Sequence, residues 1–342
     1  MTAGATVPAG VTEHVVGRGP VRLHVSTYGA AVHRLRLLDG RGPEDVALGH
    51  AGLPEYVAER DFCGATVGRF ANRLRAGRFE LDGRRFQVPT DGAAAALHGG
   101  PDGFDRRVWR TERADDDEVV LSLHSPDGDQ GFPGALDVRV AFRVEGSVVR
   151  IGYEYRSDAA TVVNLTNHTH VDLSGEGGDG VDGHLLQVPA THVTEVDTDL
   201  LPTGRLLAVA GTPLDLRAAR PLRDVVRAVH PLLVAARGLD LDYRVDGWDP
   251  ASTDLRPVAR LEHPGTGRVL EVASDRPGVQ VYTGNFFDGS TVGRSGRLLR
   301  QGAGVALETQ LPPDAPNQPG FPSAVLRPGQ VGRTATTWTF SA

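Results

Sequence analysis

The chain of 342 residues is 40% hydrophobic and 23% charged, which is the composition of an ordinary folded protein rather than of a disordered or fibrous one. Its net charge of −7 is spread along the chain without a basic block, which argues against nucleic acid as a partner. No apolar run approaches the ~20 residues of a membrane-spanning helix, and residues 1–16 lack the basic start and apolar centre of a signal peptide.

The cysteine and lysine content limits which cell compartment and which kind of covalent catalysis can be expected. Cys63 is the only cysteine, so an internal disulfide is excluded and a reducing cytoplasm is the expected location. No lysine occurs in the sequence, which excludes a Schiff base on a lysine side chain. We therefore expect a cytoplasmic protein with no membrane and no nucleic-acid partner.

Short runs rich in Val, Leu, Phe, Tyr and Thr follow one another along the chain, separated by turns rich in glycine and proline. This pattern predicts many short strands, and Asp82-Gly83 between two such runs is a strong hairpin signal. The sequence therefore predicts an all-β fold, a large β-sandwich, with residues 1–342 in a single domain. The expected strands include 21–25, 79–81, 86–88, 119–123, 138–144, 148–155, 279–282, 305–311 and 336–340.

Helical periodicity is scarce. The best candidate is the segment 221–236, although Pro231 interrupts it, and residues 54–60 are a shorter one. The expected apolar side of the longer segment consists of Val225, Val226 and Val229.

Two turn-rich segments in the first hundred residues carry polar side chains. Residues 64–73 include Arg69, Asn72 and Arg73, whose guanidinium and amide groups can donate hydrogen bonds to sugar hydroxyls. His98 is followed by two glycines, which leave the backbone open to close approach by a ligand. Surface salt bridges and structural loop contacts explain such residues as well, so both interpretations stay open.

The polar stretch 164–175 is the most unusual in the chain. In an extended segment alternate side chains share a face, and here that face carries Asn164, Thr166, His168, His170 and Asp172. Two interpretations stay open, the floor of a polar cleft and a solvated outer face of a sheet. His168 and His170 also have the His-x-His spacing of a zinc site, which would need a third ligand such as His98 or Glu308.

Three later strand-like runs carry isolated polar residues. Asp240 and Asp242 share one face of their segment, and Gln280 lies among valines. Glu308 lies in an otherwise apolar run, where burial can raise the pKa of a carboxyl group enough for it to act as a base near neutral pH. The ordinary alternative for each is an outward, solvated side chain.

In combination and order, these motifs resemble the aldose 1-epimerase family, whose members are also called galactose mutarotases. The matching stretches include Asp45-Val-Ala-Leu-Gly49, Leu97-His-Gly-Gly100, Gly103-Phe-Asp105, Leu201-Pro-Thr-Gly204 and residues 64–73, 164–173, 277–285, 307–308 and 326–329. The resemblance implies a large antiparallel β-sandwich of the galactose mutarotase type, with a cleft across one sheet. It also implies interconversion of the α and β anomers of a free aldose without a cofactor, and we expect no metal.

Carried over position by position, the resemblance implies Glu308 as general base, His168 as general acid and His98 as the second active-site histidine. A carboxylate and an imidazolium on opposite sides of the sugar would take the anomeric proton and protonate the ring oxygen. The expected substrate-binding residues are Asn72, Arg73, His170, Asp240 and Gln280.

Three departures from the family pattern surround the expected sugar site. They are the alanine run 93–96 where a polar residue is common, Leu241 within an expected Asp-His-Asn motif, and His170 at an aromatic position. The sequence therefore predicts the reaction class more firmly than the substrate. The substrate could be a modified sugar or another hemiacetal of a biosynthetic pathway. A sugar-binding protein without turnover and a metal-dependent enzyme stay open as alternatives. The expected partner is a small-molecule sugar, with the chain a monomer or a homodimer.

Overall fold

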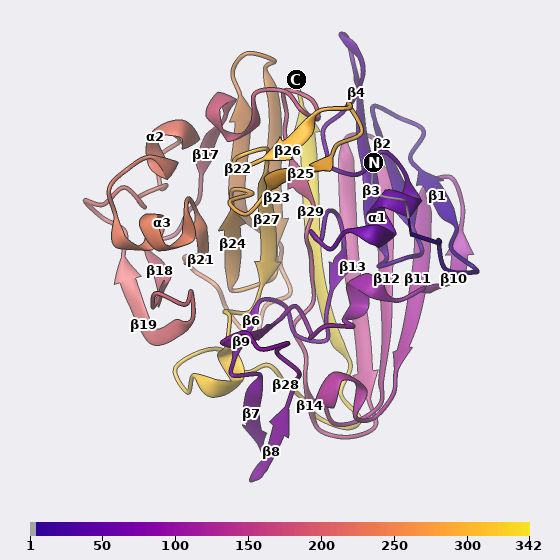
Figure 1. Ribbon diagram of the computed structural model, residues 1–342, viewed down its shortest axis with the longest axis vertical. Coiled ribbons are helices and arrows are strands. Elements are labelled where there is room, and N and C mark those ends of the chain that lie inside the picture. The colour runs from indigo at the N-terminus through magenta and orange to yellow at the C-terminus, as the bar shows by residue number, and fades with distance from the viewer. Residues whose placement is uncertain (1–4) are drawn as a thin grey trace.

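The computed structural model describes residues 5–342, and its strands form two stacked layers (Figure 1). The first layer is a nine-stranded antiparallel sheet. Its strands, in spatial order, are β10 (Arg110–Ala114), β11 (Glu118–Ser125), β12 (Leu136–Glu145), β13 (Val148–Ser157), β29 (Gly332–Ser341), β23 (Arg268–Ser274), β22 (Arg256–His263), β17 (Leu185–Gln187) and β20 (Arg220–Pro221).

The second layer consists of a six-stranded and a four-stranded antiparallel sheet. The six-stranded sheet has the order β16 (His170–Val171), β27 (Val305–Gln310), β24 (Gly278–Tyr282), β21 (Asp240–Arg244), β18 (His192–Val196) and β19 (Pro202–Ala208). The four-stranded sheet runs through β1 (Glu13–Val16), β2 (Val21–Ser26), β3 (Ala31–Asp39) and β4 (Gly42–Asp45).

Short strand pairs and short helices complete the described chain. The pairs are β5 (Thr66–Val67) with β15 (Thr166–Asn167), β6 (Arg73–Arg75) with β9 (Ala95–Leu97), β7 (Arg78–Leu81) with β8 (Arg84–Gln87), β14 (Thr161–Val162) with β28 (Val325–Leu326), and β25 (Asp288–Val292) with β26 (Leu298–Arg300). The α-helices are α1 (Leu53–Ala58), α2 (Leu222–Val226) and α3 (Pro231–Ala236). Among residues 5–342, no helix has the length and apolar character needed to cross a membrane.

Alternation of apolar and polar residues explains why the two layers pack. Every second residue of β12 points inward, so that Val140 and Phe142 are fully buried, and β27 contributes Val305 and Leu307 to the same buried cluster. The prediction of an all-β sandwich is confirmed, as is the Asp82-Gly83 hairpin between β7 and β8.

The predicted helical segment 221–236 is interrupted at Pro231, as expected. It forms two short helices, and Pro231 is the first residue of the second one. The residue before a proline avoids helical geometry, and His230 is extended with φ −146° and ψ 136°. Val225 is buried as expected, whereas Val229 falls in the connection and is 95% exposed.

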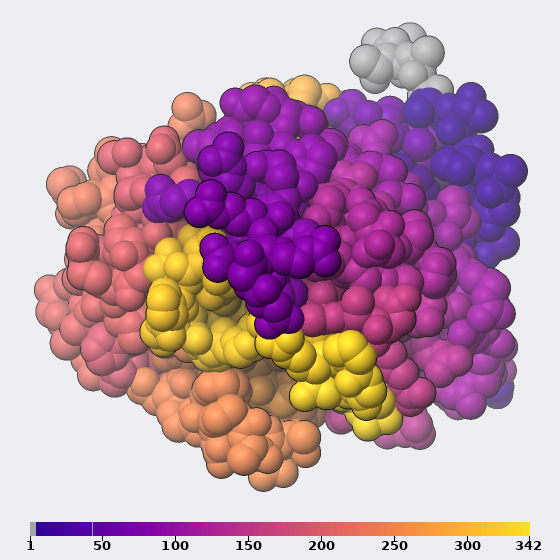
Figure 2. Space-filling view, turned by 90° about the horizontal axis from the view of Figure 1, so that it is seen from below, coloured from indigo at the N-terminus to yellow at the C-terminus, as the bar shows by residue number. Residues whose placement is uncertain are grey.

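Segments far apart in sequence meet near the end of the molecule that carries β7 and β8. Figure 2 shows the segment that includes β7 and β8, in purple, against the C-terminal part of the chain, in yellow. The backbone N–H of Asp314 donates to the carbonyl oxygen of Arg73 at 2.8 Å, and the Asp314 carboxylate accepts from the N–H of Arg75 at 2.9 Å. These bonds fix the position of the segment that carries Asn72 and Arg73.

Arg69 is buried between loops and does not line the cavity that contains Asn72 and Arg73 of the same motif. Its guanidinium donates to four carbonyl oxygens at 2.8–3.2 Å, which belong to Ser125, Pro126, Pro133 and Gly134. Burial lowers the pKa of Arg69 to about 10, so the group stays charged at neutral pH. Arg69 therefore holds two loops together, and its place in the motif of residues 64–73 is structural.

We expect Arg69→Met to lower the free energy of unfolding by more than about 3 kcal/mol, because it removes a buried guanidinium that donates to four carbonyl oxygens. Urea unfolding followed by circular dichroism measures this loss. Arg156→Met, which removes an exposed arginine, serves as control and should change stability by less than about 0.5 kcal/mol. A loss below about 1 kcal/mol in the Arg69 variant would show that water replaces the guanidinium.

Candidate active site

A cavity of about 260 Å³ opens on the face of the six-stranded sheet that points away from the core. All the catalytic and substrate-binding residues expected from the sequence line this cavity, except His170 and Gln280. The lining residues are Arg60, Asp61, Phe62, Asn72, Arg73, Leu97, His98, His168, Asp240, Tyr282, Phe286, Phe287 and Glu308.

Strand register assembles the polar face beneath this cavity. Gln280 of β24 lies directly opposite Glu308 of β27 on one side and Asp242 of β21 on the other. Tyr282 in turn lies opposite Asp240. Because paired residues in neighbouring strands share a face, one row of polar side chains crosses three strands beside the cavity.

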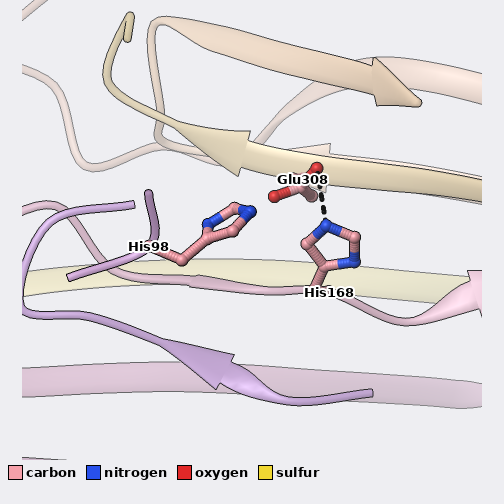
Figure 3. Close-up of side chains that lie close together, drawn as sticks. All are labelled: His98, His168 and Glu308. Atoms are coloured by element: carbon pink, nitrogen blue, oxygen red, sulfur yellow. Dashed lines mark ion pairs between the residues drawn. The ribbon is translucent and has the colours of Figure 1, made fainter. Parts of the chain in front are cut away.

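Glu308 and His168 form the centre of the site. His168 Nε2 lies 3.5 Å from Glu308 Oε1, and both side chains are buried (Figure 3). Burial raises the pKa of Glu308 well above its usual value, and the Asp240 carboxylate adds to this while Arg73 opposes it. Burial also lowers the pKa of His168 to about 4. The two shifts oppose the charged form of each group, so a single proton shared by the pair is favoured on Glu308 over His168.

His98 enters the cavity from the loop that follows β9. Its ring is buried and stands edge-on to the His168 ring, with centroids 5.2 Å apart. Its Nδ1 accepts a hydrogen bond from the backbone N–H of Asn72 at 3.2 Å. Burial, with a smaller contribution from His168, lowers the pKa of His98 well below its usual value.

Arg73 and Asp240 form a charged pair at the cavity wall. An Arg73 NH2 group donates to Asp240 Oδ2 at 3.3 Å, and the Gln280 amide donates to Asp240 Oδ1 at 2.5 Å. Gln280 is buried and does not line the cavity. It holds the carboxylate of Asp240, which leaves Asp240 and Arg73 as the groups that a ligand can reach.

His170 lies beside His168 but does not line the cavity. It is fully buried, with ring centroids 4.9 Å from His168 and 5.1 Å from Phe287. Its Nδ1 is 3.8 Å from the sulfur of Cys63. His170 therefore packs against side chains that line the cavity without lining it itself.

The stretch 164–175 is not one extended strand. Its regular parts are β15, which pairs with β5, and β16, which pairs with β27. Of the five polar residues expected on one face, His168 alone lines the cavity, and all five are buried, so a solvated outer face is wrong. Asn164 and Asp172 instead bind nearby backbone groups, Asn164 at Leu311 and Asp172 at Gly180.

Much of the cavity wall was not expected from the sequence. The additional lining residues are Arg60, Asp61, Phe62, Leu97, Tyr282, Phe286 and Phe287. Most of them lie in loops, where no periodic pattern identifies a face. Of these residues, only Tyr282 could have been identified from the sequence pattern. It alternates with Val281 in β24 and so shares the face of Gln280.

Within residues 5–342, one group of three side chains has ligand atoms close enough to hold a metal ion. It consists of His98, His168 and Glu308, whose atoms lie within 4.8 Å of one another. The His-x-His pair does not provide two of these ligands, because His170 is not part of the group. The metal hypothesis therefore rests on His98, whose Nδ1 is already engaged by Asn72.

Comparisons with known proteins agree with this geometry. Residues 15–338 match the family model described as aldose 1-epimerase. The galactose mutarotase of Bos taurus is 38% identical over 322 residues, which cover 94% of this chain and 91% of the relative. The aldose 1-epimerase of Haemophilus influenzae is 37% identical over 279 residues, covering 80% of this chain and 78% of the relative.

Solved structures give the same result. An aldose epimerase homologue from C. elegans superposes with a TM-score of 0.88 at 27% identity and covers 97% of this chain and 99% of its own. The galactose 1-epimerase of Lactobacillus acidophilus superposes with a TM-score of 0.84 at 26% identity and covers 99% of this chain and 97% of its own.

Proposed function

The chain belongs to the aldose 1-epimerase family, and we propose that it interconverts the α and β anomers of a free aldose bound beside Glu308 and His168. The observation that carries this proposal is the buried carboxylate–imidazole contact of 3.5 Å at a cavity of about 260 Å³. The two groups are close neighbours in the structure. This suits the reaction, because the anomeric oxygen and the ring oxygen are both bonded to C1.

In the proposed mechanism, Glu308 takes the proton of the anomeric hydroxyl while His168 gives a proton to the ring oxygen. The bond between C1 and the ring oxygen breaks, and C1 becomes an aldehyde. After rotation about the bond between C1 and C2, the ring oxygen attacks the other face of C1. His168 then takes the proton back from that oxygen and Glu308 returns its proton to the anomeric oxygen, so the enzyme regains its starting state.

Substrate binding is assigned to the charged and aromatic walls of the cavity. Arg73 and Asp240 offer donors and acceptors to ring hydroxyls, and Asn72 lies beside them. Phe62 and Phe287 offer apolar surface to the C–H face of a sugar. We propose Gln280 and His170 as supports of Asp240 and His168 rather than direct sugar contacts.

The test is anomer exchange measured by polarimetry or NMR on fresh α-D-glucose and α-D-galactose, followed by a panel of other aldoses. Galactose has priority because several relatives are named galactose mutarotases. Faster equilibration than buffer alone is the expected result. Saturable sugar binding without faster exchange would instead identify a binding protein that lacks turnover, and activity lost in chelator would point to a metal-dependent enzyme.

The pH dependence of kcat/KM is expected to be a broad bell. The active arrangement needs an ionised Glu308 and a protonated His168, which is one of two ways to place a single proton on the pair. Activity should fall on the acid side near pH 4, where His168 titrates and the pair gains a second proton. It should fall on the alkaline side at the raised pKa of Glu308, where the pair loses its only proton. A flat profile after subtraction of the buffer rate would contradict this assignment.

In the same proposal, the chain works as a single domain in the cytoplasm, without cofactor or metal, as a monomer or homodimer. A buried cluster with residues from Val16 to Phe340 supports the single domain. The one free and buried cysteine, Cys63, agrees with a reducing compartment.

A further inference from the structure

Asn72 and His98 are locked to each other by two hydrogen bonds. The backbone N–H of His98 donates to the carbonyl oxygen of Asn72 at 3.0 Å, and the backbone N–H of Asn72 donates to His98 Nδ1 at 3.2 Å. Both residues have left-handed backbone geometry, with φ of 64° for Asn72 and 51° for His98. Non-glycine residues in this region are uncommon and cluster at functional sites, so the pair is a specific local arrangement.

The second bond determines the tautomer of the His98 ring. A backbone N–H can only donate, so Nδ1 must present its lone pair to it. A neutral imidazole that accepts at Nδ1 carries its proton on Nε2. Protonation of Nδ1 would bring two N–H groups face to face and break the bond. The direction of the His98 pKa shift, well below the usual value, agrees with a ring that stays neutral.

The protonated Nε2 faces the reacting groups. Figure 3 shows the His98 ring with one nitrogen turned toward the Glu308 carboxylate, on the side of the oxygen that His168 does not contact. That oxygen, Oε2, is buried and has no hydrogen-bond partner among the described residues. His98 therefore aims a donor at the place where the anomeric oxygen must lie to give its proton to Glu308.

We propose that His98 is a fixed neutral hydrogen-bond donor to the anomeric oxygen, with its Nε2–H tautomer set by the backbone of Asn72. This role rests on the proposed function. When the anomeric hydroxyl loses its proton and becomes a carbonyl, negative charge develops on that oxygen, and a donor held in place stabilises it. No proton leaves His98 at any step, so the acid–base work belongs to Glu308 and His168.

The same tautomer excludes two other roles for His98, as general acid and as metal ligand. A ring that stays neutral cannot serve as the imidazolium that protonates the ring oxygen, whereas the Nδ1 of His168 has no such partner in the described chain. A neutral ring with its proton on Nε2 also offers no lone pair there to a metal ion. The potential ligand set of His98, His168 and Glu308 is therefore incomplete while the Asn72 bond is intact.

Long-range ¹H–¹⁵N NMR of the uniformly labelled protein reads the tautomer directly and needs no substrate. The expected result is a non-protonated Nδ1 and a protonated Nε2 for His98 throughout pH 5–9, assigned by the signals missing from His98→Gln. Asn72→Gly keeps the backbone N–H and should leave these signals in place. A protonated Nδ1, or a ring that titrates between pH 5 and 9, would overturn the proposal.

Two substitutions of similar length test the donor in catalysis. His98→Gln keeps an N–H donor and should lower kcat by less than about tenfold, whereas His98→Leu should lower it about 10²–10³-fold with a smaller change in KM. Urea unfolding of both variants measures any loss of folding. Equal kcat values for folded Gln and Leu variants would disprove the donor role. If no aldose is turned over by the wild type, the proposed function fails, while the NMR result still decides the tautomer.

Discussion

The variant Glu308→Gln is expected to lose about 10²–10⁴-fold in kcat, because glutamine keeps the shape of glutamate but cannot accept the anomeric proton. NMR exchange between anomers at saturating sugar measures the rate. KM should change much less, since Arg73 and Asp240 supply the proposed sugar contacts.

The same substitution should stabilise the fold. The pKa of Glu308 is raised in the folded state, so the folded protein binds this proton more tightly than the unfolded chain does. The stability from that bound proton is complete below the unfolded pKa and is lost as the pH rises toward the folded pKa. Glutamine does not titrate, so the Glu308→Gln variant does not lose this stability. The difference in the free energy of unfolding between the variant and the wild type, measured in urea, should therefore grow from pH 5 to pH 8.

Asp242→Asn is the matched control for Glu308→Gln. Asp242 is a buried carboxyl on the same sheet face, bound by the Thr194 hydroxyl at 2.6 Å and outside the cavity lining. Its amide variant should keep kcat within about tenfold. If the control lost as much activity as Glu308→Gln, the effect would come from a disturbed sheet rather than from a missing base.

The second large effect is expected for His168→Gln, which should lower kcat about 10²–10⁴-fold by removing the group that protonates the ring oxygen. The acid limb of the pH profile near pH 4 should disappear with it, because His168 is the group that titrates there. Residual activity measured between pH 3.5 and pH 7 checks this change in shape.

His170→Gln is the control for His168→Gln. Both histidines are buried and their rings are neighbours, but only His168 lines the cavity. We expect the His170 variant to stay within about tenfold of the wild type and to keep the acid limb. A larger loss for His170 than for His168 would reverse the order of their roles.

The alternation of apolar and polar residues correctly predicted the main strands of the sandwich. The alternation in 138–144 and 148–155 correctly located β12 and β13, and the run around Glu308 correctly located β27. Because β27 alternates strictly, its one carboxylate had to face away from the core, and this placed Glu308 at the cavity. Strand period is a property of the backbone, so it can be read before any tertiary contact is known.

The same reasoning failed where the backbone bends. Alternation predicted His168 and His170 on one face, but β15 and β16 pair with different strands, and only His168 lines the cavity. Phe62 and Phe286 reach the cavity from loops, where contacts with distant segments set the side-chain direction. Such positions depend on the assembled fold, which local sequence does not encode.

The position of β29 in the nine-stranded sheet has a consequence for biosynthesis. This strand pairs with β13 on one side and with β23 on the other, so it joins the two halves of the sheet. Its residues, 332–341, are translated after all the strands they connect. At ~5–20 residues per second, the ribosome needs roughly 9–35 s to pass from the end of β13 to the start of β29. During that interval the β13 edge has no partner, and the β23 edge is also unpaired once residues 268–274 have been made. Unpaired strand edges favour aggregation, so the growing chain is most exposed to it before β29 is added.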